Sequence, residues 1–163
     1  STFPLVTLLV PLFEMMRGLS LLNTWTALVL PYTVLSLPVC TLILVSFFEG
    51  IPRDLENAAM IDGCTRIGAL FRVVVPLSAP GVFTAGILAF VNAWDEFLLA
   101  LSFNSNPALR TLPVGIQMYQ GEFTFPWPVI SAALIVGIVP VAILIVLFQE
   151  RVVSGLTTGS VKG

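Results

Sequence analysis

The sequence predicts an all-α fold, a polytopic membrane helix bundle, on three observations. Of the 163 residues, 57% are hydrophobic and only 10% are charged, against about 25% charged residues in a typical soluble domain. Several apolar runs reach the roughly twenty residues that a helix needs to cross a bilayer core. A mixed-charge segment at 51–81 interrupts those runs. The seven basic residues are scattered, so no basic patch suggests nucleic acid as a partner.

Three complete spans are expected, Thr26–Phe48, Gly81–Phe103 and Trp127–Phe148. Prolines inside the first and third are tolerated because neighbouring helices can satisfy the freed carbonyls. An earlier apolar run at 3–13 is short for a span, and no initiator Met precedes it. It also lacks the basic region and cleavage site of a signal peptide. We therefore expect a partial first helix in a chain truncated at its N-terminus, with a re-entrant segment as the alternative.

The basic residues predict an orientation in the membrane. Most of them fall in segment 49–80 or in the C-terminal tail, which lie on the same side because two spans separate them: Arg53, Arg66, Arg72, Arg151 and Lys162. The opposite side has only Arg17 and Arg110. The positive-inside rule therefore places 49–80 and the C-terminus in the cytoplasm. The bias is modest, because 49–80 also contains acidic residues.

Segment 51–81, IPRDLENAAMIDGCTRIGALFRVVVPLSAPG, predicts two short helices across the membrane surface. Pro52 suits the first position of a helix, where its missing N–H costs nothing. One face collects residues spaced by three and four, namely Leu55, Ala58, Ala59 and Asp62. Gly63 is a typical helix stop, and a second helix is expected at 65–71. Alanines let a partner backbone come close, so we favour a protein partner over a hairpin resting on lipid, for which the segment is too acidic.

Short motifs along the whole chain resemble one transporter family. The stretch NAAMIDG at 57–63, followed by VVVPL at 73–77, resembles the cytoplasmic EAA loop of binding-protein-dependent ABC importer permeases. Further blocks resemble the maltose- or trehalose-type carbohydrate branch: LNT at 22–24, LPY at 30–32, AWDEF at 93–97, TLPVG at 111–115 and GLTTGSVKG at 155–163. The resemblance implies a single transmembrane permease domain over 1–163, the C-terminal part of the type I importer permease fold, with a cytoplasmic coupling segment at 49–80.

The resemblance also implies partners and a mechanism. The chain would be the permease subunit of an ATP-driven sugar importer that takes up a di- or oligosaccharide by alternating access. It shows no catalytic or metal-ligand constellation, no histidine and no GxxxxGK[ST] motif, so ATP and Mg would be bound by a dimer of partner ATPase subunits. A sister permease subunit, usually forming a heterodimer, and an extracytoplasmic sugar-binding protein would complete the complex in a bacterial or archaeal cytoplasmic (inner) membrane.

Contacts with the ATPase are expected in the coupling segment, at Glu56, Asn57, Ala58, Ala59, Asp62, Gly63, Ile67 and Gly68. One departure from the family pattern stands out, because the family usually has glutamate where this chain has Asn57. A neutral hydrogen bond from Asn57 is typically about half as strong as a charge-assisted one. Glu56 is the nearest acid, but it lies about 100° further round the helix.

The 81–103 run contains the candidate substrate path. Polar residues within a span usually face a cavity or a partner, and here they are Asn92, Asp95 and Glu96, with Trp94 able to stack on a sugar ring. The alternative is that they hydrogen-bond neighbouring helices or interfacial water. A stripe of small residues on the same run, Gly81, Ala85, Ala89 and Ala93, is expected to pack within the subunit.

Two rival functions are an intramembrane enzyme built on Asp95 and Glu96, and a passive channel. Adjacent helical residues point about 100° apart, which suits a shared catalytic centre poorly. A passive channel would leave the long cytoplasmic segment without a purpose.

Overall fold

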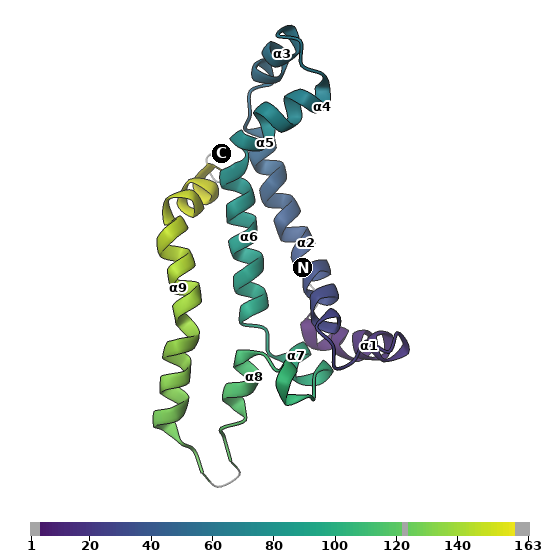
Figure 1. Ribbon diagram of the computed structural model, residues 1–163, viewed down its shortest axis with the longest axis vertical. Helices are drawn as coiled ribbons and strands as arrows, with labels where there is room; N and C mark the ends of the chain where they lie inside the picture. Colours follow the sequence, from purple (N-terminus) through teal and green to yellow (C-terminus); the bar gives the residue numbers. More distant parts are fainter. Residues whose placement is uncertain (1–3, 122–123, 159–163) are drawn as a thin grey trace. The chain divides into compact units, whose positions relative to one another are not determined.

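The computed structural model describes residues 4–121 and 124–158, and every regular element in that part of the chain is helical (Figure 1). The all-α prediction is therefore confirmed. The elements in chain order are α1 (Leu5–Gly18), α2 (Thr26–Glu49), α3 (Arg53–Ile61), α4 (Arg66–Ala69), the π-helical turn η1 (Leu70–Val74), α5 (Val75–Leu77), α6 (Ala79–Trp94), α7 (Leu98–Phe103), the 3-10 turn η2 (Pro107–Leu109), α8 (Leu112–Gln117) and α9 (Trp127–Thr158).

Two of these helices are by themselves long and apolar enough to cross a membrane. They are α2 and the Trp127–Phe148 part of α9, and both begin at the residues expected from the sequence. A third span is possible if the bent pair Arg66–Leu77 and Ala79–Trp94, which meet at 64°, crosses together. Residues 5–13 of the apolar run at 3–13 are helical as expected and belong to the longer α1, with Pro4 as its N-cap; residue 3 lies outside the described part of the chain.

The span expected at Gly81–Phe103 is not one continuous helix. Helix α6 ends at Trp94, and α7 begins at Leu98. The Glu96 side chain accepts hydrogen bonds from the backbone N–H groups of Leu99 and Ala100, at 2.8 and 3.1 Å. Side chains that bond nearby backbone N–H groups offer the chain an alternative to continuing a helix, so Glu96 both interrupts the span and begins α7.

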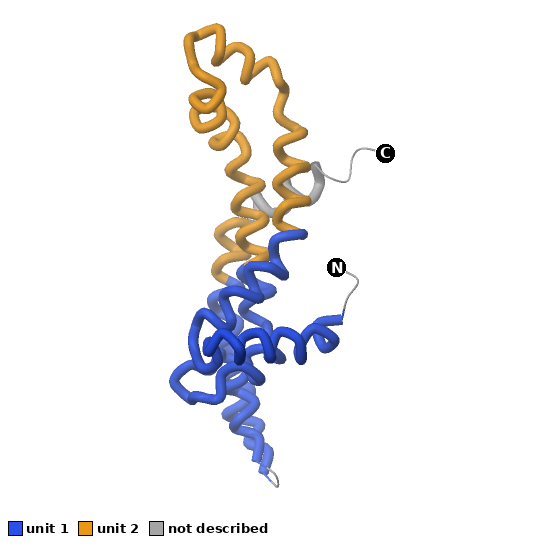
Figure 2. Tube along the Cα trace, turned by 90° about the vertical axis from the view of Figure 1, so that its right-hand side faces the viewer, with its two compact units in different colours: residues 1–38, 90–142 blue, residues 39–89, 143–163 orange. Residues whose placement is uncertain are grey.

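The Cα trace divides into two compact units (Figure 2). Unit 1 comprises 1–38 and 90–142, and unit 2 comprises 39–89 and 143–163. Because α2, α6 and α9 each contribute residues to both units, the single transmembrane domain expected from the sequence stays a prediction.

Unit 1 is built around an apolar core. Its buried members come from α1, α2, α7 and α8: Met16, Ala27, Leu28, Leu99, Ala100, Phe103 and Val114. The rings of Phe13 and Phe103 lie 6.1 Å apart in this core. Helix α7 is therefore fixed by burial on several sides, although it is only six residues long.

Unit 2 contains a close approach between α2 and α6. A side chain at Gly81 would run into the ring of Phe47. One turn along, Cys40 Sγ lies 3.6 Å from the carbonyl oxygen of Ala85 and donates to it. At these two positions of the small-residue stripe, the expected packing within the subunit is confirmed.

Candidate functional site

The coupling segment begins with α3, one residue later than expected. Pro52 has an extended backbone and is the N-cap of the helix, not its first residue, which is within the usual uncertainty of helix ends. Asp54 and Glu56 lie in the first turn, where the helix macrodipole favours negative charge.

Gly63 ends α3 as predicted. Its φ of 90° is in the left-handed region, which glycine adopts without the steric cost of a Cβ atom. The N–H of Gly63 donates to Met60 O at 3.1 Å, and the N–H of Cys64 donates to Ala59 O at 3.0 Å. This pair of bonds is the Schellman motif, and it fixes the direction in which the chain leaves α3.

The second part of the segment is longer than the expected helix at 65–71. Thr65 caps α4 by accepting the N–H of Gly68 at 3.1 Å, and helical turns continue through η1 and α5 to Leu77. Pro76 has no N–H to offer the carbonyl of Arg72, so the α-helical pattern lapses before it. The π-helical turn Leu70–Val74 occupies this position.

The expected coupling residues do not all lie on the surface. Those exposed in the chain are Asn57, Ala58, Asp62, Gly63 and Ile67. Glu56 and Gly68 are half-buried, and Ala59 is buried. Because α3 packs against α4 and η1, Ala59 faces its own chain, and only Ala58 of the pair is open to a partner.

Large apolar side chains project from the same segment. Ile61 is 85% exposed, Ile67 70% and Phe71 66%. Sequence reasoning did not select Ile61 as a coupling residue. Its spacing of three residues from Ala58 places both on neighbouring positions of the α3 surface, and that spacing could have identified it.

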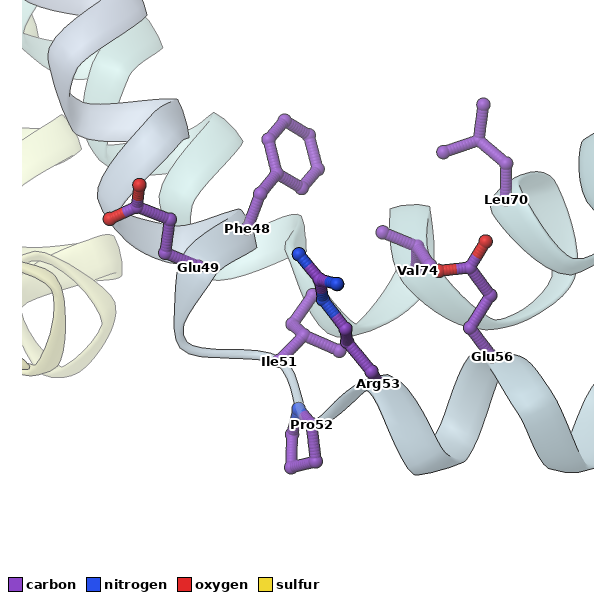
Figure 3. Close-up of a pocket in the computed structure, with 8 residues that line it drawn as sticks. All are labelled: Phe48, Glu49, Ile51, Pro52, Arg53, Glu56, Leu70 and Val74. Carbon is purple, nitrogen blue, oxygen red and sulfur yellow. The ribbon is translucent and has the colours of Figure 1, made fainter.

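A cavity of about 460 Å³ lies beside α3 (Figure 3). It is lined by Phe48, Glu49, Ile51, Pro52, Arg53, Glu56, Leu70 and Val74. Figure 3 shows that Glu56 rises from α3 toward the side of the cavity formed by η1. Asn57 does not line this cavity, so the two neighbouring side chains serve different surfaces.

The expected substrate-path residues are brought only partly together. Trp94 and Asp95 line a cavity of about 660 Å³ that is formed by the end of α6, by α8 and by the unit 1 part of α9. Phe97, Gln117 and Gln120 line the same cavity. Sequence reasoning missed the two glutamines, which lie at the end of α8 and just after it and which the fold brings to the same cavity as Asp95. Asn92 is exposed on α6 and lies outside this cavity.

Trp94 is fixed on both its polar and its apolar sides. Its indole N–H donates to the carbonyl oxygen of Gly137 in α9 at 3.1 Å. Its ring lies 5.3 Å from the ring of Phe90 and is stacked on it. Trp94 therefore holds the end of α6 to α9. Because Asp95 is the next residue in the chain, its backbone position is fixed by this contact as well.

Glu96 is also engaged within the chain. Besides the two N–H groups of α7, its Oε2 accepts a hydrogen bond from the hydroxyl of Tyr32 at 2.6 Å. Across residues 4–121 and 124–148, no group of three His, Cys, Asp or Glu side chains is placed to hold a metal ion.

Comparison with known proteins identifies the family. Residues 1–157 match the model of the binding-protein-dependent transport system inner membrane component. The chain belongs to this family. Binding-protein-dependent permeases of this kind are membrane subunits whose ATPase activity resides in a separate partner subunit, which disfavours an intramembrane enzyme built on Asp95 and Glu96.

Curated relatives of this permease family are sugar transporter subunits. The chain is 90% identical over 163 residues, covering 57% of the relative, to the sulfoquinovosyl glycerol transport system permease protein SmoH of Agrobacterium fabrum. It is 43% identical over 164 residues, covering 59% of the relative, to the trehalose/maltose transport system permease protein MalG of Thermococcus litoralis. It is 45% identical over 165 residues, covering 60% of the relative, to the trehalose transport system permease protein SugB of Mycobacterium tuberculosis. The chain thus spans less than two thirds of these permeases.

Proposed function

We propose that the chain forms the C-terminal part of a permease subunit that couples ATP hydrolysis by partner ATPase subunits to the uptake of a sugar by alternating access. The observation that carries this proposal is the α3–α5 segment. Its Gly63 bend is fixed by backbone hydrogen bonds, yet it leaves Ile61, Ile67 and Phe71 uncovered. Apolar side chains on a rigid polar platform favour a protein that docks there.

The partners follow from the family. An ABC ATPase dimer would bind ATP and Mg, so this chain itself would need no cofactor. A sister permease subunit, forming a heterodimer, and an extracytoplasmic sugar-binding protein would complete the complex in the cytoplasmic (inner) membrane. Segment 49–80 and the C-terminus would face the cytoplasm, although residues 159–163 lie outside the described part of the chain.

The substrate proposed is a small glycoside. The resemblance to the carbohydrate branch favours the di- and oligosaccharide class. The relative at 90% identity is named for sulfoquinovosyl glycerol, which narrows the proposed substrate to a sulfonated glycoside of glycerol. The cavity beside Asp95 measures about 660 Å³, within the usual range of small-molecule sites. Its amide and carboxylate groups can bond hydroxyls, and Trp94 and Phe97 offer aromatic surface. Asn92 does not line this cavity, but it stays a candidate residue of the substrate path.

Reconstitution tests this function directly. The full-length permease, its sister subunit, the ATPase and the binding protein are placed in proteoliposomes, and uptake of labelled sulfoquinovosyl glycerol and of maltose is measured with and without ATP. Uptake should require both ATP and the binding protein. Flux without either component would contradict the importer and favour a passive channel.

A substitution tests the docking surface separately. Ile67→Asp places a charge on an apolar side chain that is 70% exposed, and it should reduce co-purification of the ATPase with the permease. Met118→Asp, at a residue 52% exposed in the outer loop, serves as the control and should leave ATPase binding unchanged. Equal ATPase recovery with both variants would exclude this face as the docking surface.

A further inference from the structure

We propose that Glu96 is a positioning residue, which ties α2 to the start of α7 and so sets the bend where Trp94 and Asp95 meet the cavity. The proposal rests on the importer function proposed above and concerns the outer end of the same substrate path. It gives a role to a half-buried acidic side chain that does not itself line the cavity.

One carboxylate collects three donors from two parts of unit 1. Oε2 accepts the Tyr32 hydroxyl at 2.6 Å and the N–H of Ala100 at 3.1 Å. Oε1 accepts the N–H of Leu99 at 2.8 Å. The first N–H groups of a helix have no partner within it. Leu99 and Ala100 are fully buried, and an unpaired backbone N–H in a buried position is costly. Glu96 therefore supplies the hydrogen-bond acceptors for the first N–H groups of α7, which allows this helix to begin at Leu98.

The pieces on each side of Glu96 are already fixed. Leu99, Ala100 and Phe103 are buried in the unit 1 core, each at most 1% exposed. Trp94 is held to α9 through Gly137. The break at 95–97 therefore joins two fixed points, Trp94 on one side and the buried start of α7 on the other. The hydrogen bond from Tyr32 to Glu96 also ties the start of α7 to α2. Asp95, which is exposed, is placed in the cavity by its two neighbours.

A direct role as a sugar ligand fits Glu96 less well. Both of its oxygens already accept hydrogen bonds within the chain. A sugar hydroxyl would have to compete with backbone donors that have no other partner. Asp95 has no such bonds among the described residues and lines the cavity, so it is the acid available to the substrate, and Glu96 acts through it.

This arrangement predicts how function would change when the link is cut. Without the Tyr32–Glu96 bond, the start of α7 can shift relative to α2, and the bend no longer holds Asp95 in one position. The proposed ATPase docking surface lies on α3–α5 and includes none of these residues, so ATP hydrolysis should continue while less sugar moves per ATP.

The test uses the full-length complex in proteoliposomes with the variants Tyr32→Phe, Glu96→Gln and Glu96→Ala. Tyr119→Phe and Glu14→Gln are matched controls, because both side chains are exposed. Glu96→Ala removes all three accepted hydrogen bonds and should lower the sugar transported per ATP by at least about tenfold, the factor that corresponds to a single charge-assisted hydrogen bond. Glu96→Gln and Tyr32→Phe should lower it less, and adding Tyr32→Phe to Glu96→Ala should have little further effect.

A second readout separates positioning from simple loss of stability. Asp95→Cys is introduced in a chain with Cys40 and Cys64 replaced by serine, and its labelling by an impermeant thiol reagent is followed. Tyr32→Phe, which leaves the α7 cap in place, should change the labelling rate, whereas Tyr119→Phe should not. An unchanged transport ratio and labelling rate in Tyr32→Phe would overturn the proposal. Uptake by the unsubstituted complex without ATP would instead overturn the importer function.

Discussion

Gly81 offers the sharpest test of the packing between α2 and α6 in unit 2. A Cβ atom added at Gly81 would lie 2.6 Å from Phe47 Cδ2 and 2.9 Å from Phe47 Cβ, and it would also clash with Phe47 Cγ. Real Cβ atoms essentially never approach other heavy atoms so closely. Because Phe47 Cβ is attached directly to the α2 backbone, rotation of the ring alone cannot relieve the contact. Gly81→Ala must therefore push the two helices apart.

The magnitude follows from two opposing terms. Overpacking a close contact costs about 1–3 kcal/mol, while replacing glycine by alanine inside a helix gains up to about 1 kcal/mol. Gly86 supplies the matched control, because it lies in the same helix, and a Cβ atom there would meet nothing within 4 Å. Gly86→Ala should therefore show only the gain in helix propensity, without the cost of overpacking. We expect Gly81→Ala to be less stable than Gly86→Ala by about 1–3 kcal/mol.

The assay is the thermal stability of the detergent-solubilised full complex, scored by the loss of its monodisperse elution peak. Gly81→Ala should lower the midpoint by a few degrees relative to Gly86→Ala. Phe47→Ala, combined with Gly81→Ala, should cost less than the sum of the single changes, because removing the ring removes most of the clash. Equal midpoints for the two glycine variants, or strictly additive effects with Phe47→Ala, would refute the packing described for α2 and α6.

Other regions of the chain give further tests. Gly63→Val should lower sugar transport per ATP, because a non-glycine residue at this φ of 90° is strained by about 1–2 kcal/mol; normal transport would mean that only a turn is needed there. Asn23 has a φ of 59°, and its Oδ1 accepts the Ser105 hydroxyl and the Asn106 N–H at 3.0 and 2.9 Å. Asn23→Ala should lower the thermal midpoint more than Asn23→Asp, which keeps the acceptor, and equal midpoints would exclude this link between loops. Cys64 should react with an impermeant thiol reagent only from the cytoplasmic side, and it should cross-link to a cysteine engineered into the proposed partner ATPase; labelling only from outside would contradict the expected topology.

Local signals in the sequence were enough for two of the three expected spans and for the coupling bend. Helix α2 begins at Thr26 and α9 at Trp127, as the apolar runs predicted, because composition decides which segments enter a bilayer. Gly63 follows the end of α3 as predicted, because glycine adopts a left-handed backbone without the strain that a side chain would cause. Each of these predictions depended only on residues that are continuous in the sequence, about twenty for a span and a few for the bend.

Contacts between distant residues were beyond the reach of the sequence pattern. The break at 95–97 is fixed partly by Tyr32, which lies 64 positions away from Glu96 in the chain. Gln117 and Gln120 join Asp95 only because α8 and α9 fold beside it. The difference between Ala58 and Ala59 follows from the packing of α3 on η1, which no spacing rule contains. In each case the outcome depends on a tertiary contact that the local sequence pattern does not contain.

The replacement of the usual family glutamate by Asn57 bears on how the proposed ATPase contact is made. Glu56 is half-buried and lines the cavity beside α3, so it would have to leave that position to replace a charge about 100° away on the helix. The exposed surface therefore presents the neutral amide of Asn57 beside Ala58, and the uncovered side chains of Ile61 and Ile67. Burial of apolar surface contributes roughly 25 cal/mol per Å², whereas exposed ion pairs contribute about 0–1 kcal/mol. We infer that docking at this surface relies on shape and apolar burial, and that a lost charge at Asn57 removes only a minor part of its stability.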